Sequence, residues 1–373
     1  MSSANRSHVR GERFDPSAVS CFVNIIFTKG KIMTITITPS QSIELMMDVL
    51  KAGLVPMLTS SPGLGKSSLA KQIAKEQHLK VIDLRLSQCD PTDLGGFPMI
   101  NEDKTKASYV PMNTFPIAGD PIPTGYNGWL LLMDEFNSAP QSVQAAAYKI
   151  VLDKEVGLHK LHDKVAIICA GNLITDKAIV TKLSTAMQSR MIHFEMEANL
   201  KDWSNWAAKE GIDYRITSFI NFRPELLHNF DPDHSDKTFP CPRTWEFLSK
   251  IIKGWKSILP TKAAIIAGTI GEGPAMEFTS YCSIFDRLPT IEQIIKNPSG
   301  IEVPTEPSIL YATSGMVGAH ITKTNIDLLM AMIIRLPIEF QINSLREAIM
   351  KDRSFMKVPG IAGWIAKNSK ALL

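Results

Sequence analysis

The stretch Ser60-Ser61-Pro62-Gly63-Leu64-Gly65-Lys66-Ser67 decides how the rest of the chain is interpreted. It nearly matches G-x-x-x-x-G-K-[ST], the loop whose backbone N–H groups surround the phosphates of a nucleoside triphosphate. The apolar run 55–59 predicts a short buried strand before the loop, and the spacing of 68–74 predicts a helix after it. The alternative is a glycine-rich turn that merely precedes a helix. It is disfavoured because the sequence supplies the strand, the loop and the helix that a true phosphate-binding motif requires.

Each position of the loop has an expected role. Gly63 and Gly65 let the backbone curl so that successive N–H groups face an anion, while Lys66 reaches the terminal phosphates. Pro62 lacks an N–H and can only shape the loop. Ser60 departs from the motif, since a serine in place of the first glycine is strained if the backbone needs a positive φ. The predicted nucleotide-binding residues are Pro62, Gly63, Leu64, Gly65, Lys66, Ser67 and Ser68.

Two further strands are expected to bring polar groups to this loop. The apolar run 129–133 ends in Asp134 and Glu135. We expect Ser67 and Asp134 to hold magnesium, and Glu135 to take a proton from the water that attacks the γ-phosphate. An acidic pair after a strand can be a simple turn, but downstream of a phosphate-binding loop the catalytic interpretation is favoured. The strand 165–170 delivers Asn172, whose amide can orient that water.

Composition limits the class of protein. The 373 residues are 45% hydrophobic and 21% charged, as in a soluble globular protein of two or three domains. With 40 basic and 37 acidic residues the net charge is +3, and no long basic run indicates nucleic acid or an anionic membrane, although nucleic acid stays open. No apolar run approaches the ~20 residues of a membrane helix. We therefore expect a cytoplasmic protein without a membrane partner.

The cysteine and histidine pattern gives little sign of a metal. The five cysteines are scattered without C-x-x-C spacing, so reduced thiols are expected, with neither a disulfide nor a zinc site. His159 and His162 have the spacing H-x-x-H, which could hold a metal. Because the sequence offers no third ligand, we prefer the interpretation that these histidines are solvated or pack within loops.

The chain divides by pattern into four parts. Residues 1–32 lack a fold pattern and are expected to be a disordered leader or an extension upstream of the true start. Residues 33–198 predict an α/β nucleotide-binding core, a parallel sheet flanked by helices, in which a helix is expected over 179–187. Residues 199–285 predict a helical lid and 286–373 a helical C-terminal extension. The last long helical pattern is expected to break at Pro337.

This ordered set of motifs resembles the AAA+ ATPases, and within them the MoxR group, over about residues 40–250. By similarity, Asn172 matches the family's sensor 1, Arg190 its arginine finger and Arg243 its sensor 2, although a lone arginine is often only a surface ion pair. Ser138 departs from the group by replacing its usual arginine. The resemblance is carried by Ser61-Pro62-Gly63-Leu64-Gly65-Lys66-Ser67, Asp134-Glu135-Phe136-Asn137-Ser138-Ala139-Pro140 with Gln144, Ala170-Gly171-Asn172, Ser189-Arg190-Met191 and Cys241-Pro242-Arg243.

The resemblance implies an ATP hydrolase that uses ATP and Mg²⁺. It implies a homo-oligomeric ring, a hexamer, that remodels or activates a partner protein in the manner of a chaperone. MoxR relatives often work with proteins that carry a von Willebrand A domain. Two alternatives remain: a McrB-like translocase driven by GTP or ATP that works with a nuclease, and a small-molecule P-loop kinase, whose lid would be rich in arginines.

Overall fold

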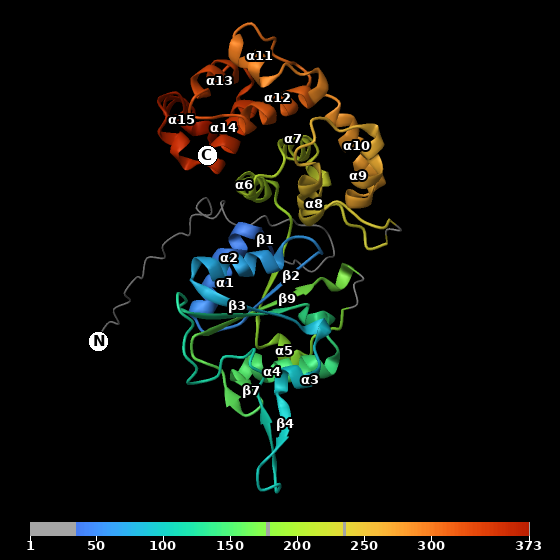
Figure 1. Ribbon diagram of the computed structural model, residues 1–373, viewed down its shortest axis with the longest axis vertical. Coiled ribbons are helices and arrows are strands. Elements are labelled where there is room, and N and C mark those ends of the chain that lie inside the picture. The colour runs from blue at the N-terminus through green and yellow to red at the C-terminus, as the bar shows by residue number, and fades with distance from the viewer. Residues whose placement is uncertain (1–34, 177–179, 234–235, 373) are drawn as a thin grey trace, which may run out of the picture.

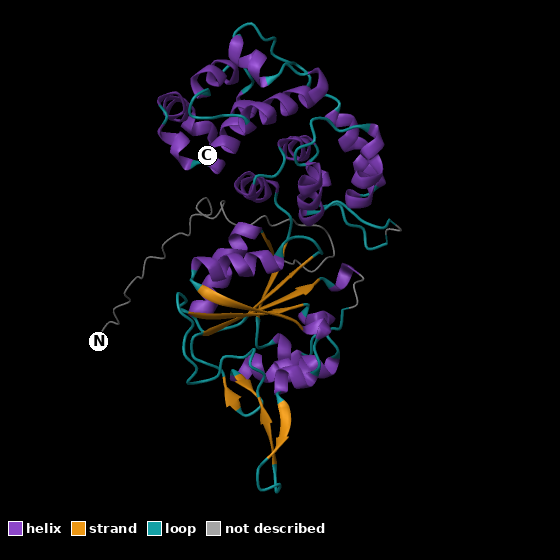
Figure 2. Cartoon of the chain, viewed as in Figure 1, coloured by secondary structure: helices purple, strands orange, loops and turns teal. Residues whose placement is uncertain are grey.

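The computed structural model describes residues 35–176, 180–233 and 236–372. A six-stranded sheet with helices on both faces forms one half of the molecule, and helices alone form the other half (Figures 1 and 2). The predicted α/β fold, a parallel sheet flanked by helices and followed by a helical region, is confirmed. The expected leader at 1–32 lies outside the described residues.

All neighbouring strands of the sheet are parallel, in the order β1-β10-β2-β9-β6-β3. The phosphate-loop strand β2 therefore lies in the interior, with β9 and then β6 beside it. The carboxyl ends of these three strands meet at one edge of the sheet, where ligands of open parallel sheets bind. The strands are β1 (Thr36–Ile37), β2 (Pro56–Ser60), β3 (Leu79–Arg85), β6 (Gly128–Asp134), β9 (Val165–Asn172) and β10 (Ile192–Met196).

Both faces of the sheet are buried, which explains the continuous apolar run in β6. Leu130 and Leu132 point to the face covered by α1 and α2, where they join one hydrophobic cluster. Leu131 and Met133 point to the opposite face, into the cluster that α4 completes. The helices of this half are α1 (Pro39–Lys51), α2 (Lys66–Glu76), α3 (Pro91–Gly95), α4 (Gln141–Asp153) and α5 (Thr185–Gln188).

The predicted helix over 179–187 is wrong for most of its length. Only α5 is helical, and Ile179 lies outside the described residues. The N–H of Thr181 donates to the carbonyl of Asn137 at 2.7 Å, which draws the chain onto the end of β6. Ser184 then begins α5 as its N-cap, because its Oγ accepts from the N–H of Met187.

Two antiparallel hairpins extend from the core. The longer one is formed by β4 (Phe97–Ile100) and β5 (Ala107–Val110), lies between α3 and β6 in sequence and projects away from the sheet (Figure 1). The shorter one is formed by β7 (Glu155–Val156) and β8 (His159–Lys160). Its histidines pack within the loops: Nε2 of His159 lies 3.2 Å from the carbonyl of Tyr109, and the ring of His162 lies 5.0 Å from that of Trp129. Among the described residues no group of three His, Cys, Asp or Glu side chains could hold a metal ion.

Two hydrophobic clusters organise the helical half. The first joins α6 to α10 around Trp245, Phe219 and Phe278, and the second joins α11 to α15 around Leu329, Ile333 and Leu345. The expected break at Pro337 is confirmed, since it separates α13 from α14. The helices are α6 (Leu200–Glu210), α7 (Tyr214–Phe222), α8 (Pro242–Ile252), α9 (Ala263–Ile270), α10 (Glu272–Cys282), α11 (Ile291–Lys296), α12 (Pro307–Ala319), α13 (Ile326–Ile333), α14 (Ile338–Lys351) and α15 (Pro359–Leu372).

Short 3₁₀ helices complete the described secondary structure. They are η2 (Leu86–Gln88), η3 (Phe136–Ser138), η4 (Ile174–Asp176), η5 (Pro224–Leu226), η6 (Pro260–Lys262), η7 (Phe285–Arg287) and η8 (Arg353–Lys357). In the described part of the chain no helix is both long enough and apolar enough to cross a membrane. The described cysteines, Cys89, Cys169, Cys241 and Cys282, are free thiols.

Helix α12 joins the two helical clusters through two close contacts at glycines, one with a side chain of α7 and one with the backbone of α14. A Cβ atom added to Gly315 would overlap the Oγ of Ser218 in α7. One added to Gly318 would lie 2.7 Å from the carbonyl oxygen of Ser344 in α14. The Oγ of Ser344 also donates to the carbonyl of Ser314 at 2.9 Å. Because glycine leaves room for these contacts, α12 packs closely against α7 and α14.

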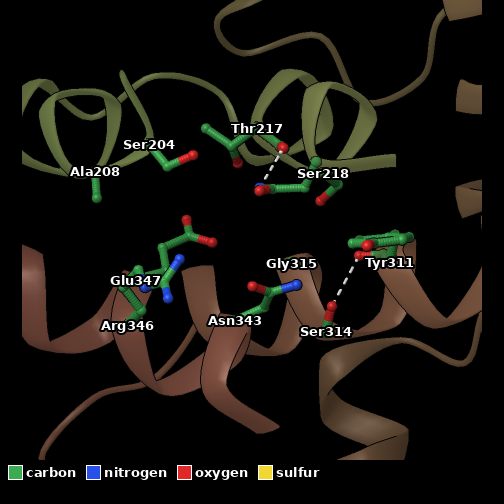
Figure 3. A pocket seen from close by; sticks show the side chains of 11 residues that line it. Ser204, Ala208, Thr217, Ser218, Tyr311, Ser314, Gly315, Asn343, Arg346 and Glu347 are labelled. Atoms are coloured by element: carbon green, nitrogen blue, oxygen red, sulfur yellow. Dashed lines mark hydrogen bonds between the residues drawn. The ribbon is translucent and has the colours of Figure 1, made fainter. Parts of the chain in front are cut away.

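A small pocket of about 30 Å³, lined mostly by residues with polar side chains, lies where α6 and α7 pack on α12 and α14 (Figure 3). This volume is enough for an ordered water. Glu347 of α14 faces Ser204 of α6 across the pocket. Burial raises the pKa of the Glu347 carboxyl to about 7, although the ammonium group of Lys351, 3.4 Å away, acts in the opposite direction. The lining residues are Ser204, Ala208, Thr217, Ser218, Asn221, Tyr311, Ser314, Gly315, Asn343, Arg346 and Glu347.

We expect Glu347→Gln to stabilise the protein in alkaline but not in acidic solution. Between the ordinary pKa of 4.5 and about 7, the folded chain holds a proton at Glu347 that the unfolded chain has lost. The contribution of this group to stability therefore falls as the pH rises through that window, by on the order of 3 kcal/mol in total. The glutamine variant should thus gain about 2 to 3 kcal/mol over wild type at pH 8 and little at pH 5, measured by urea unfolding. An equal gain at both pH values would contradict the assignment.

Candidate nucleotide-binding site

The loop between β2 and α2 has the backbone that the motif predicts. Gly63 and Gly65 take φ angles of 82° and 87°, in the left-handed region that favours glycine. Gly65 is also the N-cap of α2 and makes no side-chain cap, so the first N–H groups of the helix are available to an anion. The backbone strain considered for a serine at position 60 is absent, because Ser60 is the last residue of β2 and has no positive φ.

Lys66 is held inside the loop by oxygen atoms. Its Nζ donates to the carbonyls of Ser60 and Ser61 at 2.9 and 3.3 Å, and to Oδ1 of Asn172 at 3.1 Å. Burial lowers the pKa of the ammonium group to about 8, and the nearby Asp134 carboxylate acts in the opposite direction. Lys66 therefore remains mostly charged at neutral pH and is surrounded by acceptors that a phosphate oxygen can replace.

Ser67 and Asp134 form a site that fits magnesium. The Oγ of Ser67 donates to Oδ2 of Asp134, whose Oδ1 accepts from the N–H of Glu135 at 2.8 Å. Asp134 is buried at the end of β6. A hydroxyl and a carboxylate placed beside a phosphate loop are the oxygen ligands that Mg²⁺ takes together with substrate phosphates. The residues present thus fit ATP with Mg²⁺, on the evidence of the open helix terminus, the buried ammonium group and this oxygen pair.

Glu135 is positioned by the neighbouring strand β3. Its backbone has a φ of 57°, which turns the chain sharply after β6. The Oγ of Ser87 donates to its Oε2, and a guanidinium nitrogen of Arg85 lies 3.8 Å from its Oε1. The carboxylate is therefore oriented by the last side chain of β3 and by a side chain just after that strand. Sequence reasoning missed both residues. Their role becomes visible only in the structure, where the pairing of β3 with β6 places the ends of the two strands side by side.

Asn172 is oriented by a reciprocal pair of hydrogen bonds with Asn137. The side-chain N–H₂ of Asn137 donates to the carbonyl of Asn172 at 2.7 Å, and its Oδ1 accepts from the N–H of Asn172 at 3.1 Å. This fixes the end of β9 against the turn after β6, so that the side chain of Asn172 can meet Lys66. The role of Asn137 was not predicted, although the residue stands within the quoted Asp134 to Pro140 motif.

The start of α8 contacts the loop between β2 and α2 directly. The N–H of Arg243, in the first turn of α8, donates to the carbonyl of Gly63 at 3.3 Å. The neighbouring Cys241 packs so closely that a Cβ added to Gly63 would lie 2.9 Å from its Cβ. The charge of Arg243 also lowers the pKa of Lys66. The structure thus brings the predicted Arg243 to the site, together with Cys241, which sequence reasoning did not assign to the site.

Three predicted residues lie apart from the cluster. Arg190 is exposed: its guanidinium group donates to the carbonyl of Ala186 at 2.6 Å and lies 5.1 Å from the ring centre of Tyr148. The side chain of Leu64 is buried in the core, so this residue can offer only its backbone to a ligand. Ser68 is exposed in the first turn of α2. In chemical terms, the site combines N–H groups and Lys66 for phosphates, oxygen ligands for magnesium and a carboxylate for a proton.

Comparisons with known proteins find a likeness in structure alone. No protein-family model matches the chain, and no curated protein matches it. A candidate ATPase of Cytophaga hutchinsonii has a TM-score of 0.34 and 14% identity, with 84% of this chain and 81% of that protein covered. Two variants of RuvB from Thermotoga maritima have TM-scores of 0.35 and 0.34, each at 17% identity. They cover 75% and 78% of this chain, which spans 81% and 85% of those proteins.

Proposed function

We propose that this protein is an ATP hydrolase of the AAA+ type. The proposal is carried by one observation: Lys66 and Ser67 after β2, Asn172 at the end of β9 and Asp134 at the end of β6 contact one another, and the lid contacts the same loop through Arg243. Their bonds join the three adjacent strands β2, β9 and β6 at one edge of the sheet. Catalysis of phosphoryl transfer consists mainly of such positioning and of charge stabilisation.

Each residue of the candidate site has a separate role in the proposed reaction. The bound ATP and Mg²⁺ supply a phosphoanhydride bond and the charge that polarises it. The N–H groups at the start of α2 and the Lys66 ammonium group hold the phosphates, and Ser67 and Asp134 hold the metal. Glu135 takes the proton of the attacking water, which Asn172 orients. Arg243, the candidate sensor 2, contacts the loop from the helical lid and would sense there whether a nucleotide is bound.

We expect Lys66→Ala to remove detectable ATP binding, because the loop loses the cation that pairs with the terminal phosphates. Equilibrium titration with a fluorescent ATP analogue measures this. Lys71→Ala is the matched control, since Lys71 lies on the same helix but pairs with Asp83 at 2.8 Å on the surface. ATP binding by Lys66→Ala with the affinity of wild type would contradict the proposed site.

The finer proposal is a MoxR-like machine. In it, the subunits form a ring, most simply a hexamer, in which Arg190 serves the site of the neighbouring subunit. The ring remodels or activates a protein partner, such as one with a von Willebrand A domain. Arg190 is exposed and its guanidinium group bonds to Ala186 and Ser189 nearby, away from Lys66 and Asp134 of its own chain, which supports an action outside its own subunit.

Two alternatives give different outcomes in one assay of turnover. A McrB-like translocase should prefer GTP or respond to DNA, and a small-molecule kinase should need an acceptor other than water. Turnover of ATP and of GTP, each with and without DNA, therefore separates the three functions. ATP hydrolysis that needs neither DNA nor a small acceptor supports the AAA+ machine, whereas a strict requirement for either would replace it.

A further inference from the structure

A carboxylate with no assigned task lies under the phosphate loop. Asp176 ends η4, the short helix that follows β9, and is only 8% exposed. Its Oδ1 accepts from the Oγ of Ser61 at 3.2 Å. Its Oδ2 is buried, and no described residue donates a hydrogen bond to it. A buried unpaired carboxylate oxygen is uncommon, so a donor is expected at this position in some state of the protein.

The lid places a histidine on the next residue of the same loop. Nε2 of His228 lies 3.2 Å from the carbonyl of Pro62. Because a carbonyl only accepts, Nε2 must carry the proton of the neutral ring. Nδ1 is then left without a proton, and no hydrogen bond joins it to another described residue. Asp176 and His228 thus hold consecutive residues of the phosphate loop, and each has one unused atom.

Asp176 and His228 interact with each other and with two neighbouring residues through their charges. Burial raises the pKa of Asp176 and lowers that of His228, and each group opposes the shift of the other through its charge. Lys66 of α2 acts on both, since it lowers the pKa of each. On the β10 side, the carboxylate of Asp176 raises the pKa of Glu195, so the two repel each other. Added positive charge between Asp176 and His228 would relieve this repulsion.

We propose that Asp176 and His228 are positioning residues that share one proton while a nucleoside triphosphate is bound, and that this pair clamps the lid to the phosphate loop. The inference rests on the ATP binding proposed above. The negative phosphates beside Lys66 favour a new positive charge nearby. A proton from the buffer binds Nδ1 of His228, and the new N–H donates to Oδ2 of Asp176. The proton returns to the buffer when the nucleotide leaves.

The proposal is tested by calorimetry on the full chain with a non-hydrolysable ATP analogue and excess Mg²⁺. Titrations at pH 7 in two buffers of different ionisation enthalpy give the number of protons taken up. We expect about 0.5 to 1 proton per site, and an affinity that falls up to tenfold per unit rise in pH near neutrality. Lys66, with its pKa of about 8, is already mostly charged at this pH and contributes about 0.1 proton.

Matched variants locate the proton. His228→Gln keeps an N–H for the carbonyl of Pro62 but cannot titrate, and Asp176→Asn keeps an acceptor for Ser61 but has no charge. Each should lose at least half of the proton uptake. His193→Gln is the control, because Nε2 of His193 also meets a carbonyl, that of Gln188 at 2.9 Å, on the surface of β10. It should keep the full uptake.

Three results would overturn the inference: wild-type binding without proton uptake, full uptake in His228→Gln, or full uptake in Asp176→Asn. The pH dependence of wild-type affinity decides the question even if a variant fails to fold. A wild-type chain that binds no nucleotide at any pH would refute the proposed function itself, so the two failures are distinguishable.

Discussion

Glu135→Gln is expected to bind ATP as tightly as wild type and to turn it over at least about 100-fold more slowly, because general-base catalysis contributes on the order of 10²- to 10⁴-fold. The amide has the size of the carboxylate and its oxygen can still accept from Ser87, so the site keeps its shape. It cannot take the proton of the attacking water. Phosphate release under saturating ATP, together with a binding titration, measures both effects.

The matched control for this substitution is Glu155→Gln. Glu155 lies in the short hairpin and pairs with Lys149 at 3.1 Å, away from the phosphate loop. Its turnover should equal that of wild type. If Glu135→Gln hydrolysed ATP at the wild-type rate, neither Asp134 nor Glu135 would have the assigned role.

Arg190→Ala is expected to lower turnover by roughly 10³- to 10⁵-fold while ATP binding is retained. Negative charge builds on the phosphoryl oxygens in the transition state, and an arginine supplied by a neighbouring subunit stabilises that charge more than it stabilises bound ATP. Arg353→Ala removes an exposed arginine from η8 and serves as the control.

Mixing two inactive variants tests whether Arg190 acts between subunits. Glu135→Gln and Arg190→Ala are each expected to be inactive alone. In a mixed ring, some interfaces join an intact Glu135 to an intact Arg190 of the next subunit, and these should recover activity. Exchange of subunits is verified with two affinity tags. No recovery in exchanged rings, or full activity of Arg190→Ala by itself, would leave Arg190 as a structural arginine.

The sequence predicted the parts of the site that local pattern encodes. Strands buried on both faces must be continuously apolar, so the ends of β2, β6 and β9 could be recognised, and with them Lys66, Asp134 and Asn172. The glycines of the loop were recognisable because only they adopt its positive φ angles without strain. Neighbouring strand ends then account for the meeting of Lys66 with Asn172 and of Ser67 with Asp134.

The residues that sequence reasoning missed reach the candidate site through contacts between segments that are distant in the sequence. Ser87 reaches Glu135 because β3 pairs with β6, and His228 contacts the carbonyl of Pro62 from 166 residues further along the chain. The predicted helix over 179–187 failed for a related reason: the N–H of Thr181 bonds to the distant carbonyl of Asn137, and Ser184 caps a helix that begins only at Thr185. Spacing within a segment carries no information on such tertiary competition.

Helix α12 holds the two helical clusters together at close range. Gly315 lies against the Ser218 side chain of α7 and Gly318 against the backbone of Ser344 in α14, so a larger side chain at either position would force these helices apart. The same helical half contacts the loop between β2 and α2 through Arg243 and Cys241, and α11 lies at its far end (Figure 1). Any rotation of the helical half about this contact would therefore displace α11 farther than α8, because α11 lies farther from it (Figure 1).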